Sequence, residues 1–257
     1  MIKIQYASDL HLEFAENSRY IKSHPLNVVG DMLLLAGDIG YLGDDNYDKH
    51  PFWSWASDNF ERVIVIPGNH EFYKQFDIEQ LYNGWEYKIR ENVKCLYNVV
   101  VPLKEDLELI ATTLWSKIEP QDAYITENSV SDFRRIRCKN DLLTWERFNG
   151  EHNKCLDFLK NSIAKSKAKH IIVATHHVPS CQLMADEFKG SPLNGAFTVE
   201  LGNYIASSPI EYWIYGHSHR NIDATIGHTH CVSNQLGYVF QNEQYSFDSG
   251  KYIIVQD

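Results

Sequence analysis

The sequence of 257 residues predicts an α/β fold, with two sheets and helices outside them. Three observations support this prediction. Strand and helix patterns alternate in the first half of the chain, and short β-rich runs occur in the middle and near the C-terminus. Five apolar runs end in polar residues that could bind metal. No repeat or linker interrupts the chain, so we expect a single domain over residues 1–257.

The first half of the chain shows strands and helices in turn. Buried strands are predicted where apolar runs meet turn residues, at 2–8, 32–36 and 63–66. A helix is predicted over 51–59, because proline is favoured in a first helical turn. A second helix is predicted over 77–90, where helical spacing is kept by Ile78, Leu81, Trp85 and Ile89.

The second half is predicted to mix short strands with one long helix. An antiparallel portion is predicted from short strands at 93–96, 99–103 and 107–114. Residues 119–140 are polar and predicted to be irregular, and residues 141–167 form a long helix, or two if Gly150 breaks it. A loop over 179–195 and a short helix over 197–206 complete this half. The remaining strands are predicted at 171–175, 212–215 and 252–255.

The composition is that of an ordinary globular protein, with 44% hydrophobic and 23% charged residues. A net charge of −10 and the lack of a long basic block disfavour nucleic acid as a partner. No signal peptide is visible, and no apolar run approaches the length of a membrane span. Five cysteines without a CxxC pair fit reduced thiols. We therefore expect a cytoplasmic protein with no membrane partner, and the oligomeric state stays open.

Polar side chains follow the last apolar residue of five predicted strands. They are Asp9 and His11, then Asp38, Asn69, His176, and finally His217 and His219. In α/β sheets, ligands collect outside the carboxyl ends of the strands, so we expect these side chains to meet. Imidazole, carboxylate and amide oxygen together suit first-row transition metals. Seven such groups are too many for one ion, but they fill two sites if one carboxylate bridges.

The order of these motifs resembles that of the calcineurin-like metallophosphoesterase superfamily. The motifs are Asp9-Leu10-His11, Gly37-Asp38, Gly68-Asn69-His70-Glu71, Thr175-His176-His177 and Gly216-His217-Ser218-His219. One such motif would be weak evidence, whereas all five occur in the family's order over nearly the whole chain. The resemblance implies a four-layer α/β/β/α sandwich of two mixed sheets and the activity of a metal-dependent phosphoric ester hydrolase.

The resemblance also implies how the ligands divide between two divalent transition-metal ions. One ion would be bound by Asp9, His11, Asp38 and His219, and the other by Asp38, Asn69, His176 and His217. A hydroxide between the ions would attack phosphorus. His70 would protonate the leaving oxygen or stabilise the transition state, or would instead hold Asn69 or a water. Manganese is the expected metal, with iron, zinc and nickel as alternatives.

The charge of such a site favours a small phosphorylated substrate. Two divalent ions carry four positive charges, and the carboxylates of Asp9 and Asp38 offset two of them. The remaining positive charge would attract phosphate. The ester could be a monoester or a diester. Candidate substrate contacts are His177, Arg134, Arg135 and Arg137. The arginines could clamp a phosphate through two hydrogen bonds each, or they could pair with Asp132 and Asp141 on a solvated loop; His177 could instead support a ligand.

Three further interpretations concern Tyr41 and the activity of the protein. Asp38-Ile39-Gly40-Tyr41 matches an element of purple acid phosphatases in which the tyrosine binds ferric iron. Those enzymes have no histidine at the position of His11. Because His11 is present here as a ligand, we expect Tyr41 to pack or to support a ligand. A nuclease is the first alternative function, which the chain length and charge disfavour. The second is a catalytically silent scaffold with the same fold, which would have lost ligands, and none is missing here.

Overall fold

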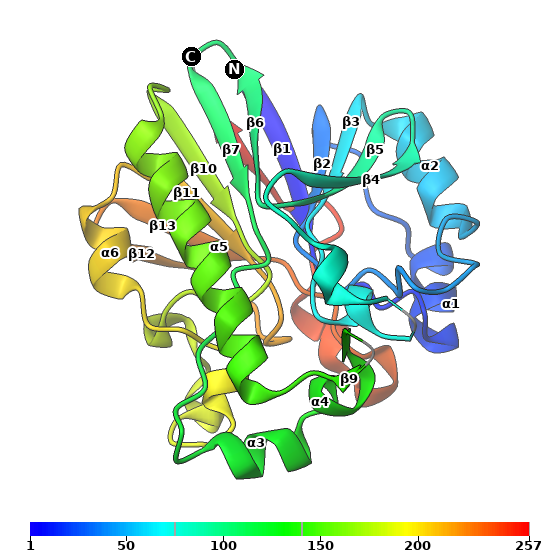
Figure 1. Cartoon of the computed structure of the whole chain (residues 1–257). Helices are drawn as coiled ribbons and strands as arrows, with labels where there is room; N and C mark the ends of the chain where they lie inside the picture. Colours follow the sequence, from blue (N-terminus) through cyan, green and yellow to red (C-terminus); the bar gives the residue numbers. More distant parts are fainter. Residues whose placement is uncertain (75, 140, 257) are drawn as a thin grey trace.

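Two six-stranded mixed sheets pack face to face and carry helices on their outer faces (Figure 1). The computed structural model describes residues 1–74, 76–139 and 141–256. The strand order is β14-β1-β2-β3-β5-β4 in the first sheet and β12-β13-β11-β10-β7-β6 in the second. Helices α1 and α2 lie outside the first sheet, and α5 and α6 lie outside the second. This arrangement is the predicted four-layer sandwich.

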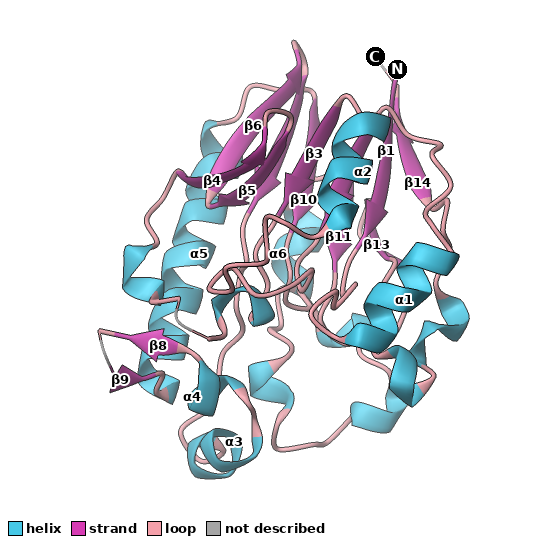
Figure 2. Cartoon of the chain, turned by 90° about the vertical axis from the view of Figure 1, so that its right-hand side faces the viewer, coloured by secondary structure: helices cyan, strands magenta, loops and turns pink. Residues whose placement is uncertain are grey.

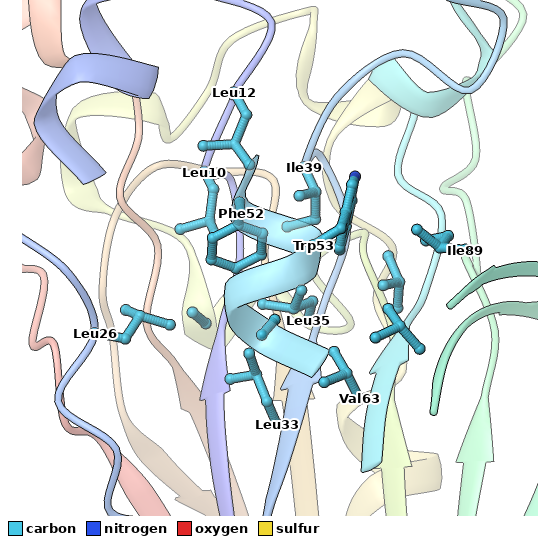
Figure 3. Close-up of a cluster of buried hydrophobic side chains, with 14 of the residues drawn as sticks. Leu10, Leu12, Leu26, Leu33, Leu35, Ile39, Phe52, Trp53, Val63 and Ile89 are labelled. Carbon is cyan, nitrogen blue, oxygen red and sulfur yellow. The ribbon is translucent and has the colours of Figure 1, made fainter. Parts of the chain in front are cut away.

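The first sheet has a parallel centre and antiparallel edges. Its parallel strands are β1 (Ile2–Ala7), β2 (Met32–Leu35), β3 (Arg62–Val65) and β5 (Val93–Tyr97). Its edge strands are β14 (Tyr252–Val255) and β4 (Trp85–Arg90). Helices α1 (Ala15–Ser23) and α2 (Pro51–Asn59) cover its outer face. Figure 3 shows Phe52 and Trp53 of α2 packed on Leu33 and Leu35 of β2. The predicted helix over 51–59 is therefore confirmed.

The second sheet repeats this plan. Its parallel strands are β7 (Leu107–Ala111), β10 (His170–Ala174), β11 (Tyr212–Tyr215) and β13 (Thr229–Ser233). Its edge strands are β6 (Val99–Lys104) and β12 (Ala224–Ile226). Helices α5 (Trp145–Lys165) and α6 (Gly202–Ser207) cover its outer face. None of the helices in the described ranges is long and apolar enough to cross a membrane.

The layer between the sheets is apolar. Side chains of β1, β2 and β3, such as Ile4, Leu34 and Ile64, meet Leu109 of β7 and Ile172 of β10. All five are at most 2% exposed. Parallel strands buried on both faces are continuous apolar runs rather than alternating ones, which is the pattern that predicted them. The same packing aligns the carboxyl ends of both parallel sets at one edge of the sandwich.

The predicted helix over 77–90 is wrong. Residues Ile78–Gln80 form a single 3₁₀ turn, and Trp85–Arg90 is strand β4, paired antiparallel with β5. Gly84, with φ +92°, precedes this strand. Trp85, Tyr87 and Ile89 all pack on the outer core, so the apolar residues also follow the two-residue period of a strand. Trp85 and Ile89, which are four residues apart, fit both the helical spacing and the alternation of a strand.

Other segments differ from the prediction in detail. Helix α5 starts at Trp145 and runs through Gly150 unbroken, and α6 starts only at Gly202 and ends at Ser207, one residue beyond the predicted 197–206. Strands β5, β6 and β7 form, but they do not make one antiparallel portion, because β5 belongs to the first sheet and β6 and β7 to the second. Only β6 and β7 pair antiparallel with each other, and β5 and β7 also pair parallel with β3 and β10. The segment expected to be irregular contains α3 (Ala123–Ser129), α4 (Asp132–Arg135) and β8 (Arg137–Cys138), which pairs with β9 (Asp141–Leu142); Asn140 lies outside the described residues. Figure 2 shows these elements grouped below the sheets.

Candidate metal centre and active site

The candidate ligands lie on the loops that follow β1, β2, β3, β10 and β11. Five of them have a left-handed backbone, namely Asp9 (φ 54°), His11 (φ 47°), Asp38 (φ 56°), His217 (φ 77°) and His219 (φ 50°). Such conformations are uncommon for residues with a Cβ atom, and they accumulate at functional sites. The loops also approach closely, because a Cβ on Gly68 would lie 2.2 Å from Asp38 Oδ1. The backbone is therefore shaped to bring these side chains together.

A first cluster contains Asp9, His11 and His219, whose ligand atoms all lie within 4.8 Å of one another. The Nε2 atoms of His11 and His219 are 3.0 Å apart, and His219 Nε2 is 3.4 Å from Asp9 Oδ1. Asp9 and His11 are fully buried. Two imidazole nitrogens facing each other beside a buried carboxylate form a donor set that suits a divalent transition metal.

A second cluster contains Asp38, His176 and His217. His176 Nε2 is 3.4 Å from Asp38 Oδ1 and 3.0 Å from Asn69 Oδ1, so Asn69 adds an amide oxygen to this group. The other oxygen of Asp38, Oδ2, is 3.9 Å from Nε2 of His11 in the first cluster. One carboxylate thus presents one oxygen to each cluster, which is the arrangement a bridging ligand requires.

Whether the four histidine ligands fit metal ions depends on what the second ring nitrogen of each one contacts. The four contacts are His11 Nδ1 to Glu13 Oε1 (3.0 Å), His176 Nδ1 to the Ala36 carbonyl (2.8 Å), His217 Nε2 to the Ala196 carbonyl (3.2 Å) and His219 Nδ1 to Glu243 Oε2 (2.7 Å). Carbonyl and carboxylate oxygens only accept, so these nitrogens donate, and in the neutral ring the opposite nitrogen has the lone pair that would bind an ion. Metal-binding histidines are oriented in this way. The residues therefore fit two ions.

Glu71 fastens two of the ligand loops to each other. Its buried carboxylate accepts backbone N–H groups from Asp38 (2.8 Å), Ile39 (2.7 Å), Gly40 (3.1 Å) and Gly68 (2.6 Å). The first three belong to the loop after β2 and the last to the loop after β3. The sequence shows the motif that contains Glu71, but it does not indicate this role, because the backbone groups that Glu71 binds belong to two separate loops.

His70 faces the cavity from the loop after β3. Its backbone N–H donates to Asp38 Oδ1 at 2.9 Å, and its ring Nδ1 donates to Glu13 Oε1 at 2.8 Å. The free Nε2 lies 3.3 Å from the Tyr238 hydroxyl and 3.9 Å from Asp38 Oδ2. Burial alone would lower the pKa of His70, but the carboxylates of Asp38 and Glu13 raise it overall. The side chain is thus placed to hold a proton at Nε2.

Glu13 was not predicted as a site residue, although it extends the alternation of Asp9 and His11 by one step. A single oxygen, Oε1, accepts from both His11 and His70. Burial would raise the pKa of Glu13, but the two histidines outweigh it and lower this pKa to about 2. An ionised Glu13 therefore orients one candidate metal ligand and the candidate proton donor at the same time.

A cavity of about 500 Å³ opens over both clusters. Its floor is made by Asp38, Asn69, His70, His217 and His219. The opposite walls are largely apolar and come from α3–α4 and the 184–198 loop, with Val130, Met184, Phe188, Leu193 and Phe197. Phe14 and Tyr238 close one side. The cavity therefore joins a polar floor to an apolar chamber.

Of the predicted substrate contacts, the cavity contains Arg135, whose guanidinium lies 5.3 Å from the centre of the Tyr73 ring. Arg134 donates to the Asn128 and Ser129 carbonyls, and Arg137 is exposed on β8, so neither lines the cavity. His177 is fully buried, with its ring 4.1 Å from that of His217 and Nδ1 3.0 Å from Ser116 Oγ. A supporting position fits His177 better than substrate contact does.

Tyr41 lies against the site without joining either ligand cluster. Its ring stacks on that of His70 with 6.0 Å between centroids, and it is 9% exposed. His11 occupies the first cluster, as expected. This placement agrees with a packing role for Tyr41.

Comparison with known proteins extends these observations. Residues 2–221 match the sequence model of the calcineurin-like phosphoesterases. An uncharacterized protein of Acanthamoeba polyphaga mimivirus is 27% identical over 97% of this chain and 95% of its own. The crystal structure of the phosphopantetheinyl hydrolase of Mycobacterium tuberculosis superposes with a TM-score of 0.72 at 13% identity, covering 99% of this chain and 96% of that one.

A second solved structure, a protein of Thermus thermophilus, gives a TM-score of 0.52 at 11% identity, covering 91% of this chain and 89% of that one. At such identities, structural likeness establishes the fold alone. The family match spans most of the chain and includes every candidate ligand, and the ligand side chains gather in two buried clusters beneath one cavity. The chain therefore belongs to the calcineurin-like phosphoesterase family of metal-dependent phosphoester hydrolases.

Proposed function

We propose that the protein hydrolyses a small phosphorylated substrate at a dinuclear metal centre. The observation that carries this proposal is the position of Asp38, which directs one oxygen toward each ligand cluster at the floor of the cavity. If the site held a single ion, one of the two ligand clusters would bind no metal. Two ions side by side match the geometry needed to hold both the attacking and the leaving oxygen of a phosphoryl group.

The ligands of the two ions follow from the clusters. Asp9, His11, Asp38 and His219 would hold one ion, and Asp38, Asn69, His176 and His217 would hold the other. When bound, the ions would lower the pKa of water and offset the negative charge of the phosphoryl oxygens. The mixture of imidazole, carboxylate and amide supports manganese, with iron, zinc or nickel as alternatives.

His70 is proposed to protonate the leaving oxygen. Its Nδ1 is occupied by Glu13, so Nε2 alone can reach a substrate in the cavity. A positioned proton donor of this kind typically contributes about 10²- to 10⁴-fold to the rate. Arg135 is proposed to hold a phosphoryl oxygen, since it is the only Lys or Arg among the described residues that line the cavity.

The apolar chamber supports a substrate with an uncharged organic portion. Val130, Met184, Phe188 and Leu193 form walls away from the metal clusters, and a volume of about 500 Å³ is far larger than a phosphate group needs. Cavities of about 300–1,000 Å³ with such walls typically hold organic ligands. The name of the similar hydrolase from Mycobacterium tuberculosis specifies a phosphopantetheinyl group, so an ester of this type belongs among the candidates.

Substrate and metal can be tested together. Metal-stripped protein would be reconstituted with manganese, nickel, zinc or iron and assayed on p-nitrophenyl phosphate, bis-p-nitrophenyl phosphate, cyclic nucleotides, phosphopantetheine and single-stranded DNA. We expect two ions per chain and metal-dependent release of phosphate or of the alcohol. Full activity with one ion per chain would refute the dinuclear proposal. Two bound ions with no hydrolysis of any ester would favour the silent scaffold, and cleavage of single-stranded DNA alone would favour the nuclease.

A further inference from the structure

Asp132 is a buried carboxylate that lies beside the candidate metal ligand Asn69. It is the first residue of α4 and only 1% exposed. Its Oδ1 accepts a hydrogen bond from Asn69 Nδ2 at 2.8 Å and another from the Tyr73 hydroxyl at 2.6 Å. Asn69 lies 63 residues earlier in the chain. Buried carboxylates are rare unless they are paired, so the pairing with Asn69 is a specific feature of the fold.

The pairing fixes which end of the Asn69 amide faces the metal clusters. The two ends of an amide have nearly the same shape, but the oxygen accepts and the NH₂ group only donates. The NH₂ group donates to Asp132 Oδ1, and a carboxylate oxygen accepts, so this contact selects the NH₂ end of the amide. The amide oxygen then points the other way, and it lies 3.0 Å from His176 Nε2 in the second cluster. An amide turned around would present NH₂ to the ion, and NH₂ is no ligand.

We infer that Asp132 is a positioning residue that locks the Asn69 amide with its oxygen toward the second metal site. The inference rests on the proposed dinuclear function. It also assigns a purpose to α4, because the same short helix carries Arg135, three residues later, into the cavity. Asp132 does not pair with the neighbouring arginines as one sequence-based interpretation suggested, since the partners of Oδ1 are Asn69 and Tyr73.

The test is a metal titration, which needs no substrate. Metal-stripped wild type, Asp132→Ala and Asp132→Asn would be titrated with Mn²⁺ by calorimetry. Loss of a partner that orients a ligand typically costs about 10- to 100-fold in metal affinity. We expect Asp132→Ala to weaken one of the two binding events by about this factor and to leave the other nearly unchanged. Asp132→Asn keeps an oxygen that can accept from Asn69, so it should restore most of the lost affinity.

Two controls separate orientation from general damage. Tyr73→Phe removes the other hydrogen bond to the same oxygen and a long contact of 3.4 Å from Asn69 Nδ2 to the Tyr73 hydroxyl, but it leaves the 2.8 Å bond between Asn69 and Asp132. Its Mn²⁺ affinities should therefore stay near those of wild type. In an Asn69→Ala background, Asp132→Ala should cause no further loss, because there is no amide left to orient. If Asp132→Ala does not fold, Asp132→Leu, which fills similar space without accepting a hydrogen bond, takes its place.

The outcomes distinguish this inference from the proposed function. Wild type that binds a single Mn²⁺ would refute the dinuclear function itself. Wild type with two binding events, together with an Asp132→Ala variant that binds both ions equally well, would overturn only the role of Asp132. Equal weakening of both events, or a further loss in the Asn69→Ala background, would show that Asp132 acts on the whole fold and would also overturn the inference.

Discussion

Replacing Glu71 by glutamine is expected to destabilise the protein strongly. Each oxygen of Glu71 accepts two backbone N–H groups, Oε2 from Asp38 and Gly68, and Oε1 from Ile39 and Gly40. A glutamine amide keeps one oxygen, so two of these N–H groups would face an NH₂ group that only donates. Leaving a buried polar group without its partner costs about 1–3 kcal/mol. Two such groups therefore predict a loss of about 2–6 kcal/mol, against a typical total stability of about 5–15 kcal/mol.

Denaturant unfolding of the metal-free proteins measures this loss. The matched control is Glu200→Gln, because Glu200 also accepts backbone N–H groups, from Cys181 and Gly202, but is exposed. Water can replace the lost acceptor there, so the control should change the free energy of unfolding by about 0.5 kcal/mol or less. The variant should also bind metal more weakly, since Glu71 holds the Asp38 loop. A Glu71→Gln protein as stable as the control would refute the view that these four bonds fasten the loops.

Three further predictions concern the chemistry. His70→Asn should keep both metals and lose about 10²- to 10⁴-fold of kcat on an alkyl phosphate, but much less on p-nitrophenyl phosphate, whose leaving group needs no proton; equal losses on both substrates would contradict the role. Asp38→Ala should reduce both bound ions in elemental analysis, whereas His11→Ala should mainly reduce one; a loss confined to one ion in both variants would argue against a bridge. Tyr41→Phe should leave the visible spectrum of a ferric form unchanged, and the disappearance of a tyrosinate band would make Tyr41 a ligand.

The buried parallel strands were predictable because each is apolar on both faces. Runs such as Met32–Leu35 have no polar face, so they cannot be mistaken for elements at the surface, and a turn follows them immediately. The edge strand Trp85–Arg90 was not predictable in this way. Trp85 and Ile89 also fit helical spacing when Ile78 and Leu81 are counted with them, and only the pairing with β5 decides between the two. Edge strands depend on a partner that local sequence does not reveal.

The residues of the candidate site also differ in how far the sequence could predict them. Its seven proposed ligands follow strand ends, so their convergence could be expected from topology alone. Glu13 could have been found, since it continues an alternation with Asp9 and His11, whereas Asp132 could not. Asp132 lies in a polar segment beside three arginines, and its partner Asn69 is 63 residues away. Local charge predicted an ion pair on a solvated loop, and tertiary packing produced a buried hydrogen bond.

The left-handed backbone at five proposed ligands has a consequence for how the protein would respond to selection. Each such residue costs about 1–2 kcal/mol relative to glycine, which adopts this conformation freely. Glycine at His219 would relieve this strain while Glu243 keeps its contact with Arg220, so selection for thermal stability alone is expected to favour it at the expense of a proposed ligand. At the fully buried His11 the same change would leave a cavity and remove a partner of Glu13, which offsets the gain. The same trade-off is useful in the laboratory. His219→Gly should give an inactive protein that stays well folded, which is the form needed to capture an uncleaved substrate for its identification.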